Sequence, residues 1–344
     1  MEQYAGIDVS VESVSVCVVD AAGKMVREAK LACEPEPLIT WFRALAVVPV
    51  RIGLEAGPLS QWLYAAMADA GLAVELLETR HVRDAFRAMP VKSDRNDARG
   101  IAQLMRLGWF RPVHCKSLPS QEVRALLTAR RLLLGKRHDI EMSLRGFGLK
   151  VGETTPRTFE GRIRALASGH PMLERIAAAL LGACAELSRQ LRGLEKTVGE
   201  TARRCARTRL LMSTPGVGAI IGLTFVAAID DPGRFRSSKQ VGAHFGLTPR
   251  KYQSGETDVT GRISKIGDGS VRTALYEAAN IILTRPVKGS ALKRWGLAVA
   301  KRAGAGKAKV ALARKLACVL HRMLVDGTPF AAEPARQWQP AAAN

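Results

Sequence analysis

Four carboxylates in the first hundred residues have types and positions suited to phosphodiester chemistry. Asp8 lies in an apolar stretch that is expected to be a strand, and Glu55 ends a second such stretch. Asp94 and Asp97 are three residues apart, so on a helix they share one face. Carboxylates that meet at one sheet edge repel one another unless a cation compensates them, and Mg²⁺ is the usual cation in such sites. The pattern predicts a magnesium site.

The elements that must position these carboxylates alternate between strands and helices. Strands are expected within 4–19, as a single strand or a hairpin, and over 25–32, 48–55 and 72–78, with helices over 59–70 and 94–107. Strands that come first, followed by strands interleaved with helices, predict an α/β domain with a mixed sheet and helices on its faces. This first domain is predicted to span residues 1–118.

The same carboxylates also have interpretations without chemistry. Asp94 is a good helix N-cap with Asp97 reaching back, an arrangement that stabilises a helix by about 0.5–2 kcal/mol. Asp8 could pair with a neighbouring arginine. The order of a strand Asp, a strand Glu and a helical Asp pair favours catalysis over these separate roles.

The composition indicates a folded protein with a polyanionic partner. The chain has 344 residues, and its 52 Lys and Arg against 31 Asp and Glu give a formal net charge of +21. A length of this order predicts two or three domains, at about 100–200 residues each. A hydrophobic content of 47% excludes a disordered basic tail. The charge therefore favours a nucleic-acid-handling protein.

A membrane protein is not expected. The first residues lack the basic and apolar regions of a signal peptide. The long uncharged run between Arg209 and Asp230 contains Pro215 and several glycines, so it predicts a turn and a buried helix instead of a membrane span. Six widely spaced cysteines, without a CxxC pair, argue against a zinc site or a disulfide framework and fit a reducing cytoplasm.

Two further regions follow the α/β domain. Residues 119–208 are predicted to be helical, because a heptad pattern runs from Leu180 to Cys205; it suits either a helical hairpin within the chain or a coiled coil between chains. Residues 209–326 are predicted to form a mainly α-helical domain, and 327–344, rich in Ala and Pro, a disordered tail.

Basic and glycine-rich segments of the third region are candidates for nucleic-acid binding. The stretch Arg285–Arg322 holds eleven Lys or Arg and no acid, which predicts a phosphate-facing surface. The turn at 215–218 could place backbone N–H groups against a phosphate, or it could simply connect two helices. The candidate contacts are Gly216, Gly218, Arg250, Lys251, Arg262, Lys265, Arg272, Lys293, Arg294, Lys301 and Arg302.

Several of these motifs together resemble one family. The order Asp8, Glu55, Asp94, Asp97 resembles the DEDD tetrad of RuvC-like nuclease domains with the RNase H fold. Two segments are similar to those of transposases of the insertion sequence 110 family. They are Lys92-Ser93-Asp94-Arg95-Asn96-Asp97-Ala98 and, after it, Trp109-Phe110-Arg111-Pro112-Val113. The resemblance continues through Pro215-Gly216-Val217-Gly218, Gly246-Leu247-Thr248-Pro249-Arg250, Gln253-Ser254-Gly255 and Gly261-Arg262-Ile263-Ser264-Lys265, to about Asp326.

The resemblance implies a mechanism that the spacing of residues does not show. Members of the family are recombinases guided by a structured non-coding RNA, the bridge RNA, which pairs with target and donor double-stranded DNA. The implied metal ligands for Mg²⁺ are Asp8, Glu55, Asp94 and Asp97, and the implied nucleophile is Ser254, which forms a covalent phosphoserine link. The family works as a homotetramer in which different protomers supply the two halves of each site.

Ser254 and the overall function keep alternatives at this point. Exposed serines in polar, turn-prone loops are usually turn formers, and His244, the nearest histidine in sequence, favours a structural role over that of a general base. The tetrad could instead activate water in a junction-resolving endonuclease. The chain could also be an inactive RNA- or DNA-binding scaffold. Formation of a covalent protein–DNA adduct would distinguish a recombinase that uses Ser254 as its nucleophile from a junction-resolving endonuclease.

Overall fold

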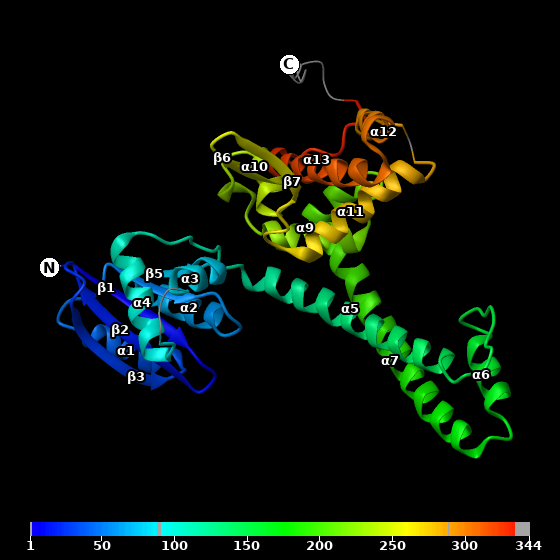
Figure 1. The fold of residues 1–344 in the computed structure, drawn as a ribbon, viewed down its shortest axis with the longest axis horizontal. Coiled ribbons are helices and arrows are strands. Elements are labelled where there is room, and N and C mark those ends of the chain that lie inside the picture. The colour runs from blue at the N-terminus through cyan, green and yellow to red at the C-terminus, as the bar shows by residue number, and fades with distance from the viewer. Residues whose placement is uncertain (1, 88–90, 288, 334–344) are drawn as a thin grey trace. The chain divides into compact units, whose positions relative to one another are not determined.

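The computed structural model describes residues 2–87, 91–287 and 289–333, and the chain divides into two compact units, Met1–Lys116 and Ser117–Asn344 (Figure 1). The first unit contains β1 (Gln3–Val9), β2 (Ser13–Asp20), β3 (Met25–Ala32), α1 (Pro35–Arg43), β4 (Arg51–Glu55), α2 (Ser60–Asp69), β5 (Val74–Leu77), α3 (Thr79–Phe86) and α4 (Asp94–Leu107). The predicted hairpin, strands and two helices are confirmed, with β4 and β5 shorter than expected. Helices α1 and α3 were not predicted.

The five strands form one mixed sheet in the order β3-β2-β1-β4-β5. Strand β2 is antiparallel to β1 and to β3, whereas β4 is parallel to β1 and to β5. Three antiparallel strands followed by two parallel ones that are reached through helices is the RNase H-type arrangement that the family resemblance implied. The carboxyl ends of β1 and β4 consequently meet at one edge of the sheet.

Alternation along the strands separates the two faces of this sheet. Ala5 and Ile7 of β1, with Ile52 and Leu54 of β4, join the core formed with α1 and α2. The residues between them point to the opposite face. That face includes Gly6, Asp8, Gly53 and Glu55, and α4 covers it, as Figure 1 shows where α4 crosses β1 and β2.

Two glycines let α4 approach the sheet closely. Gly6 and Gly53 are register partners on β1 and β4. A Cβ on Gly6 would overlap the backbone of α4 at the Ala98 carbonyl and the Ala102 nitrogen. A Cβ on Gly53 would lie 2.8 Å from the Met105 sulfur and 2.9 Å from Cγ2 of Ile101, so it would meet side chains instead of backbone. Gly6 meets Ala98 and Ala102, whereas Arg51, the register partner of Tyr4 near the start of β1, donates to the Met105 carbonyl near the end of α4, so the helix runs opposite to β1 and its first turn lies next to Asp8.

The second unit is helical apart from one hairpin. It contains α5 (Leu118–Arg145), α6 (Phe159–Ala167), α7 (Pro171–Arg204), α8 (Ala206–Met212), α9 (Ala219–Ile229), a 3₁₀ turn (Pro232–Arg234), α10 (Ser238–His244), β6 (Pro249–Ser254), β7 (Thr257–Ile263), α11 (Gly269–Thr284), α12 (Ala291–Ala303) and α13 (Ala305–Asp326). Within the described ranges, none of the helices has both the length and the apolarity needed to span a bilayer. The run from Arg209 to Asp230 is a turn and the buried helix α9, as predicted.

The heptad region forms α7, which lies alongside α5 of the same chain (Figure 1). Val198 and Ala202 of α7 pack with Leu126 and Leu127 of α5, and Arg130 pairs with Glu195 at 2.9 Å. The hairpin within the chain therefore describes this seam, and a coiled coil between chains stays a prediction.

The start of α5 is held by the buried Asp230 at the end of α9, whose carboxylate accepts from the Ser117 N–H at 2.9 Å and the Ser120 hydroxyl at 2.7 Å.

The predicted three-part division at 118 and 208, with a tail from 327, remains a prediction. The described beginning of the tail segment is held in place: Phe330 donates to the Ser213 hydroxyl at 2.9 Å, and Ala291 donates to the Ala332 carbonyl at 2.9 Å. These contacts do not fit disorder over 328–333. The expected disorder of 334–344 concerns residues outside those that the structure describes.

We expect Gly6→Ala to destabilise the first unit far more than Gly53→Ala. The first change forces a methyl group into helix backbone, which cannot yield without displacing α4, whereas the second requires only the side chains of Met105 and Ile101 to shift. Overpacking of this kind costs about 1–3 kcal/mol or more. Chemical denaturation of both variants, monitored by circular dichroism, measures the difference. Equal unfolding midpoints would contradict the role assigned to Gly6.

Candidate active site

Asp8 and Glu55 lie side by side at the end of two parallel strands. Ile7 is the register partner of Leu54, so the next residues of β1 and β4 occupy neighbouring positions at the sheet edge. Both follow a glycine by two residues and thus share the face that α4 covers. The apolar, partly β-branched residues that precede the two carboxylates are buried and favour strands. The carboxylates themselves lie at the ends of these strands, at the edge of the core.

The first turn of α4 brings Asp94 and Asp97 to the same edge. The helix is capped by Ser93, whose hydroxyl accepts from the Asn96 N–H at 3.3 Å. The capping alternative for Asp94 is therefore wrong, because Asp94 is the first residue inside the helix and Ser93 does the capping. Both carboxylates remain at the positive end of the helix dipole, which favours negative charge there.

The carboxylates influence one another electrostatically. Burial raises the pKa of Asp8 to about 6, and the charges of Asp97 and Asp94 raise it as well. Burial and the charge of Asp8 also raise the pKa of Glu55, while a hydrogen bond with Thr79 lowers it. Like charges act on each other in this way only at short range. The structure thus brings the four predicted residues into one acidic cluster, which here means Asp8, Glu55, Asp94 and Asp97.

Residues that the sequence patterns did not single out support this cluster. Glu28 of β3, whose side chain is 13% exposed, forms ion pairs with Arg95 and Arg99 of α4. These pairs hold the first two turns of the helix on the sheet and lower the pKa of Glu28. Lys92, just before α4, lowers the pKa of Asp8 and of Glu55. In the sequence, the only signal for these supporting contacts is that basic residues alternate with Asp94 and Asp97 over 92–99.

The acidic cluster suits a hard cation in its donor set. Carboxylate oxygens are the ligands of Mg²⁺ and similar ions, and mutual repulsion favours a cation among them. Over 2–87, 91–287 and 289–333, however, no three His, Cys, Asp or Glu side chains are arranged so that they could already hold a metal ion. The donor chemistry fits a divalent metal, and the side chains would need to turn toward it.

Ser254 lies in an exposed hairpin of the second unit. It is the last residue of β6 and pairs with Thr257 across the two-residue turn Gly255-Glu256, where Gly255 has a φ of 53°. Every residue of β6 is exposed. The expected polar loop is therefore a strand end, and the serine hydroxyl is presented to solvent. Sequence patterns missed the hairpin because its strands have no buried face.

The base of this hairpin is fastened by close backbone contacts. Gly246 and Gly267, with φ of 67° and 82°, lie where a Cβ would overlap the backbones of Ile266 and His244. Arg272 donates from one nitrogen to the carbonyls of Phe245, Ile266 and Gly267 at 2.9–3.1 Å. His244 packs edge-on against Phe235 and Phe245, which agrees with a structural role.

The candidate nucleic-acid contacts fall into several environments, and their binding role stays a prediction. Gly216 packs against α11, where a Cβ would lie 2.8 Å from the Ala278 carbonyl, while Gly218 caps α9 in open space. Several of the basic candidates have partners within the chain: besides Arg272, Arg250 donates to the Ser264 carbonyl, Lys251 pairs with Asp258, Lys293 donates to the Arg285 carbonyl and Arg294 pairs with Glu333. Arg262, Lys301 and Arg302 are exposed, and Lys265 adopts a positive φ of 56°.

Comparison with known families agrees with this fold and cluster. A family model for DEDD-type transposases of the IS110 group, described as "Transposase", matches residues 5–147, and the model "Transposase IS116/IS110/IS902 family" matches residues 208–293. The fold, the acidic cluster and these matches define a transposase with an N-terminal RuvC-like domain. The chain belongs to the IS110/IS116/IS902 family of insertion-sequence transposases, as the motifs indicated.

Similar proteins are found in several bacteria. The chain is 29% identical to the transposase for insertion sequence element IS1111A of Coxiella burnetii, over 93% of this chain and 88% of that protein. It is 24% identical to the transposase for IS1328 of Yersinia enterocolitica, over 82% and 86%. Among solved structures, RuvC of Thermus thermophilus in complex with a Holliday junction substrate aligns with 33% of this chain, at 16% identity and a TM-score of 0.27.

The raised pKa of Asp8 predicts that Asp8→Asn stabilises the protein at neutral pH. The folded-state pKa of about 6 exceeds the usual value of 3.8, so the folded chain binds this proton more tightly than the unfolded chain does. The resulting loss of stability is absent below about pH 4 and complete above about pH 6. We expect a gain of roughly 1 kcal/mol for the variant at pH 7.5 in EDTA, after allowance for solvent screening.

Thermal unfolding of the two proteins at pH 4 and at pH 7.5 measures this difference. The exposed Glu12→Gln is the matched control and should show no such pH dependence. A variant that is less stable than wild type at pH 7.5, or a gain that grows toward pH 4, would show that burial and the neighbouring carboxylates do not raise the pKa of Asp8.

Proposed function

We propose that this transposase cuts and rejoins DNA at a site that combines the acidic cluster with Ser254. The acidic cluster carries the proposal, because the favourable position of Asp94 and Asp97 at the start of α4 does not account for Asp8 and Glu55 at the strand ends beside them. They are not needed to cap α4, and their mutual repulsion costs stability. Such an arrangement is expected where a cation and a phosphodiester are to be bound.

The residues have distinct roles in this proposal. Asp8, Glu55, Asp94 and Asp97 would hold divalent metal, proposed to be Mg²⁺. A metal bound there supplies positive charge to offset the negative charge that develops on the phosphate. Lys92 is a positioning residue that moderates the repulsion in the cluster. Glu28 keeps Arg95 and Arg99 paired, so that their guanidinium groups do not neutralise the carboxylates.

Ser254 is the proposed nucleophile. Its oxygen forms a bond to phosphorus, its proton passes to a base or to water, and the bond from phosphorus to one sugar oxygen breaks. That oxygen leaves as a hydroxyl after taking up a proton. The phosphoserine ester preserves one phosphate ester bond, so a hydroxyl on another strand can attack it and release the serine. Rejoining therefore needs no further energy source, which suits recombination better than hydrolysis does.

The resemblance to the insertion sequence 110 family supports three further parts of the proposal. A structured bridge RNA selects donor and target DNA by base pairing, which would leave the protein to bind backbone instead of sequence. A homotetramer brings together carboxylates and serines from different protomers. The reaction takes place in the cytoplasm. The basic stretch from Arg285 to Arg322 is the proposed backbone-binding surface.

The first test is a covalent adduct assay. The protein is expressed with the non-coding region that flanks its element, mixed with Mg²⁺ and labelled donor and target DNA, and analysed on a denaturing gel. We expect a protein-linked DNA band that needs both RNA and Mg²⁺. Ser254→Ala and Asp8→Asn should each reduce it by at least about 10³-fold, as loss of a nucleophile or its activation does elsewhere.

Thr260→Ala, on the other face of the same hairpin, is the matched control for Ser254→Ala and should retain the band. Free cleaved ends from Ser254→Ala would instead establish a metal-dependent nuclease in which the serine is structural. If Asp8→Asn matched wild type in every measured activity, the carboxylate would have no catalytic role, and the result would favour the catalytically inactive binding scaffold.

A mixing experiment tests whether different protomers share one site. Asp8→Asn and Ser254→Ala proteins are each expected to be inactive alone. Because each still supplies the half that the other lacks, co-assembled mixtures should recover part of the wild-type adduct. Size-exclusion chromatography with light scattering should show a tetramer in the same samples. Mixtures that form tetramers but stay inactive would mean that each protomer must supply both halves.

A further inference from the structure

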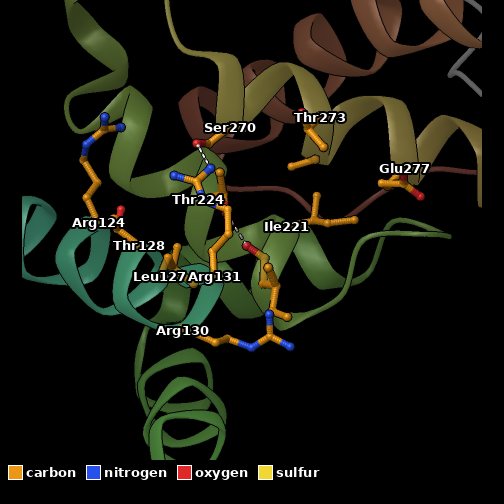
Figure 2. A pocket seen from close by; sticks show the side chains of 12 residues that line it. Arg124, Leu127, Thr128, Arg130, Arg131, Ile221, Thr224, Ser270, Thr273 and Glu277 are labelled. Atoms are coloured by element: carbon orange, nitrogen blue, oxygen red, sulfur yellow. Dashed lines mark hydrogen bonds between the residues drawn. The ribbon is translucent and has the colours of Figure 1, made fainter. Parts of the chain in front are cut away.

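A cavity in the second unit carries an inference beyond the proposed catalytic residues. It has a volume of about 340 Å³ and lies among α5, α9 and α11. Its lining includes the apolar Leu127, Ile220 and Ile221 together with arginines and hydroxyl-bearing residues. Figure 2 labels ten of the residues that line it. Cavities of about 300 Å³ and more, with an apolar lining and a few polar groups, are typical of small-ligand sites.

The three arginines that line the cavity are not equivalent. Arg124 pairs with Asp268 at 2.5 Å, and Arg130 pairs with Glu195 at 2.9 Å. Arg131 is exposed and donates to the neutral hydroxyl of Ser270 at 2.7 Å. Its charge is thus available to an anion, and Ser270 holds the guanidinium in place, as the dashed line in Figure 2 shows.

The opposite end of the cavity has the opposite charge. Glu277 of α11 lines it and is exposed. Figure 2 shows Glu277 at the far end of the row of labelled side chains from Arg124. A ligand with an anionic group at one end, a hydrogen-bond donor at the other and an apolar surface between them would match these lining residues.

We infer that the cavity binds one unstacked nucleotide of a nucleic-acid strand. Its phosphate contacts Arg131 and Ser270, its base lies on Leu127, Ile220 and Ile221, and an exocyclic amino group of the base donates to Glu277. Carboxylates accept hydrogen bonds from the amino group of cytosine in this manner. The choice of a nucleotide rests on the proposed role in nucleic-acid processing, while the geometry of the ends predicts a preference for cytosine over uracil or thymine.

The test is the binding of labelled eight-nucleotide strands to the full chain, without Mg²⁺, over a range of salt concentrations. Wild type should bind oligo-dC or oligo-rC about 3- to 10-fold more tightly than oligo-dT or oligo-rU. Arg131→Gln should weaken binding of all four and reduce the salt slope by about 0.7, the value for one phosphate of a single strand. Glu277→Ala should abolish the cytosine preference without weakening oligo-dT binding.

Arg192→Gln and Glu122→Ala, exposed residues of α7 and α5 outside the cavity, are the matched controls. Arg131→Lys should restore part of the salt slope, and thermal unfolding should show that all variants fold. An unchanged slope in Arg131→Gln on both DNA and RNA would overturn the inference. If the slope changes on one of them, the tighter strand identifies whether the nucleotide belongs to DNA or RNA.

The outcome is separable from that of the proposed function. Adduct formation with an unchanged salt slope in Arg131→Gln would remove the nucleotide site alone. A changed slope without any adduct would remove the serine mechanism and leave the nucleotide site standing. A wild-type protein that binds none of the four strands would overturn the nucleotide site, while the adduct assay would still decide the proposed function.

Discussion

The absence of a side chain at Gly6 is the constraint on which the candidate active site depends. Helix α4 lies so close to β1 that its backbone occupies the space where a Cβ of residue 6 would be. Gly53 gives the same helix room beside β4. Because α4 runs opposite to β1, this approach brings its first turn to the end of the strand, next to Asp8. The acidic cluster therefore results from backbone packing, and the ion pairs of Glu28 with Arg95 and Arg99 secure the helix from the side.

A comparable device holds the hairpin of Ser254. Every residue of β6 is exposed, and of β7 only the last residue, Ile263, packs against the core. A two-stranded hairpin alone is only marginally stable. Its stability comes from its base, where Gly246 and Gly267 allow backbone to contact backbone and Arg272 joins three carbonyls. A hairpin that is fixed at its base and exposed at its turn end suits Ser254, the proposed nucleophile, which must reach a phosphodiester. In both units, glycines that permit close backbone contact anchor the element that carries a residue proposed for chemistry.

Several features could be predicted from the sequence, for physical reasons that particular residues illustrate. Asp94–Leu107 has helical spacing and a capping serine before it, and the observed helix has the predicted bounds. The β1–β2 hairpin and β3 follow from apolar alternation. The hairpin β6–β7 could not be predicted, because exposed strands carry no such alternation. Helix α1 starts at Pro35, a position where proline is tolerated but which reads as a turn in sequence. The assignment of the N-cap to Asp94 was wrong because the neighbouring Ser93 is equally suited, and only the backbone conformation decides between them.

The sequence by itself determined the chemistry that is available: four carboxylates in a fixed order, a large positive charge, and motifs of a transposase family. These depend on residue type and local spacing, which the chain carries without folding. Tertiary structure alone decided that Asp8 and Glu55 are neighbours and that Glu28 and Lys92 act on the cluster. It also decided that, among the described residues, Arg124 and Arg130 form ion pairs whereas Arg131 donates to a neutral hydroxyl. Each of these depends on contacts between residues far apart in the chain, and such contacts follow from strand register and helix packing, which no local pattern encodes.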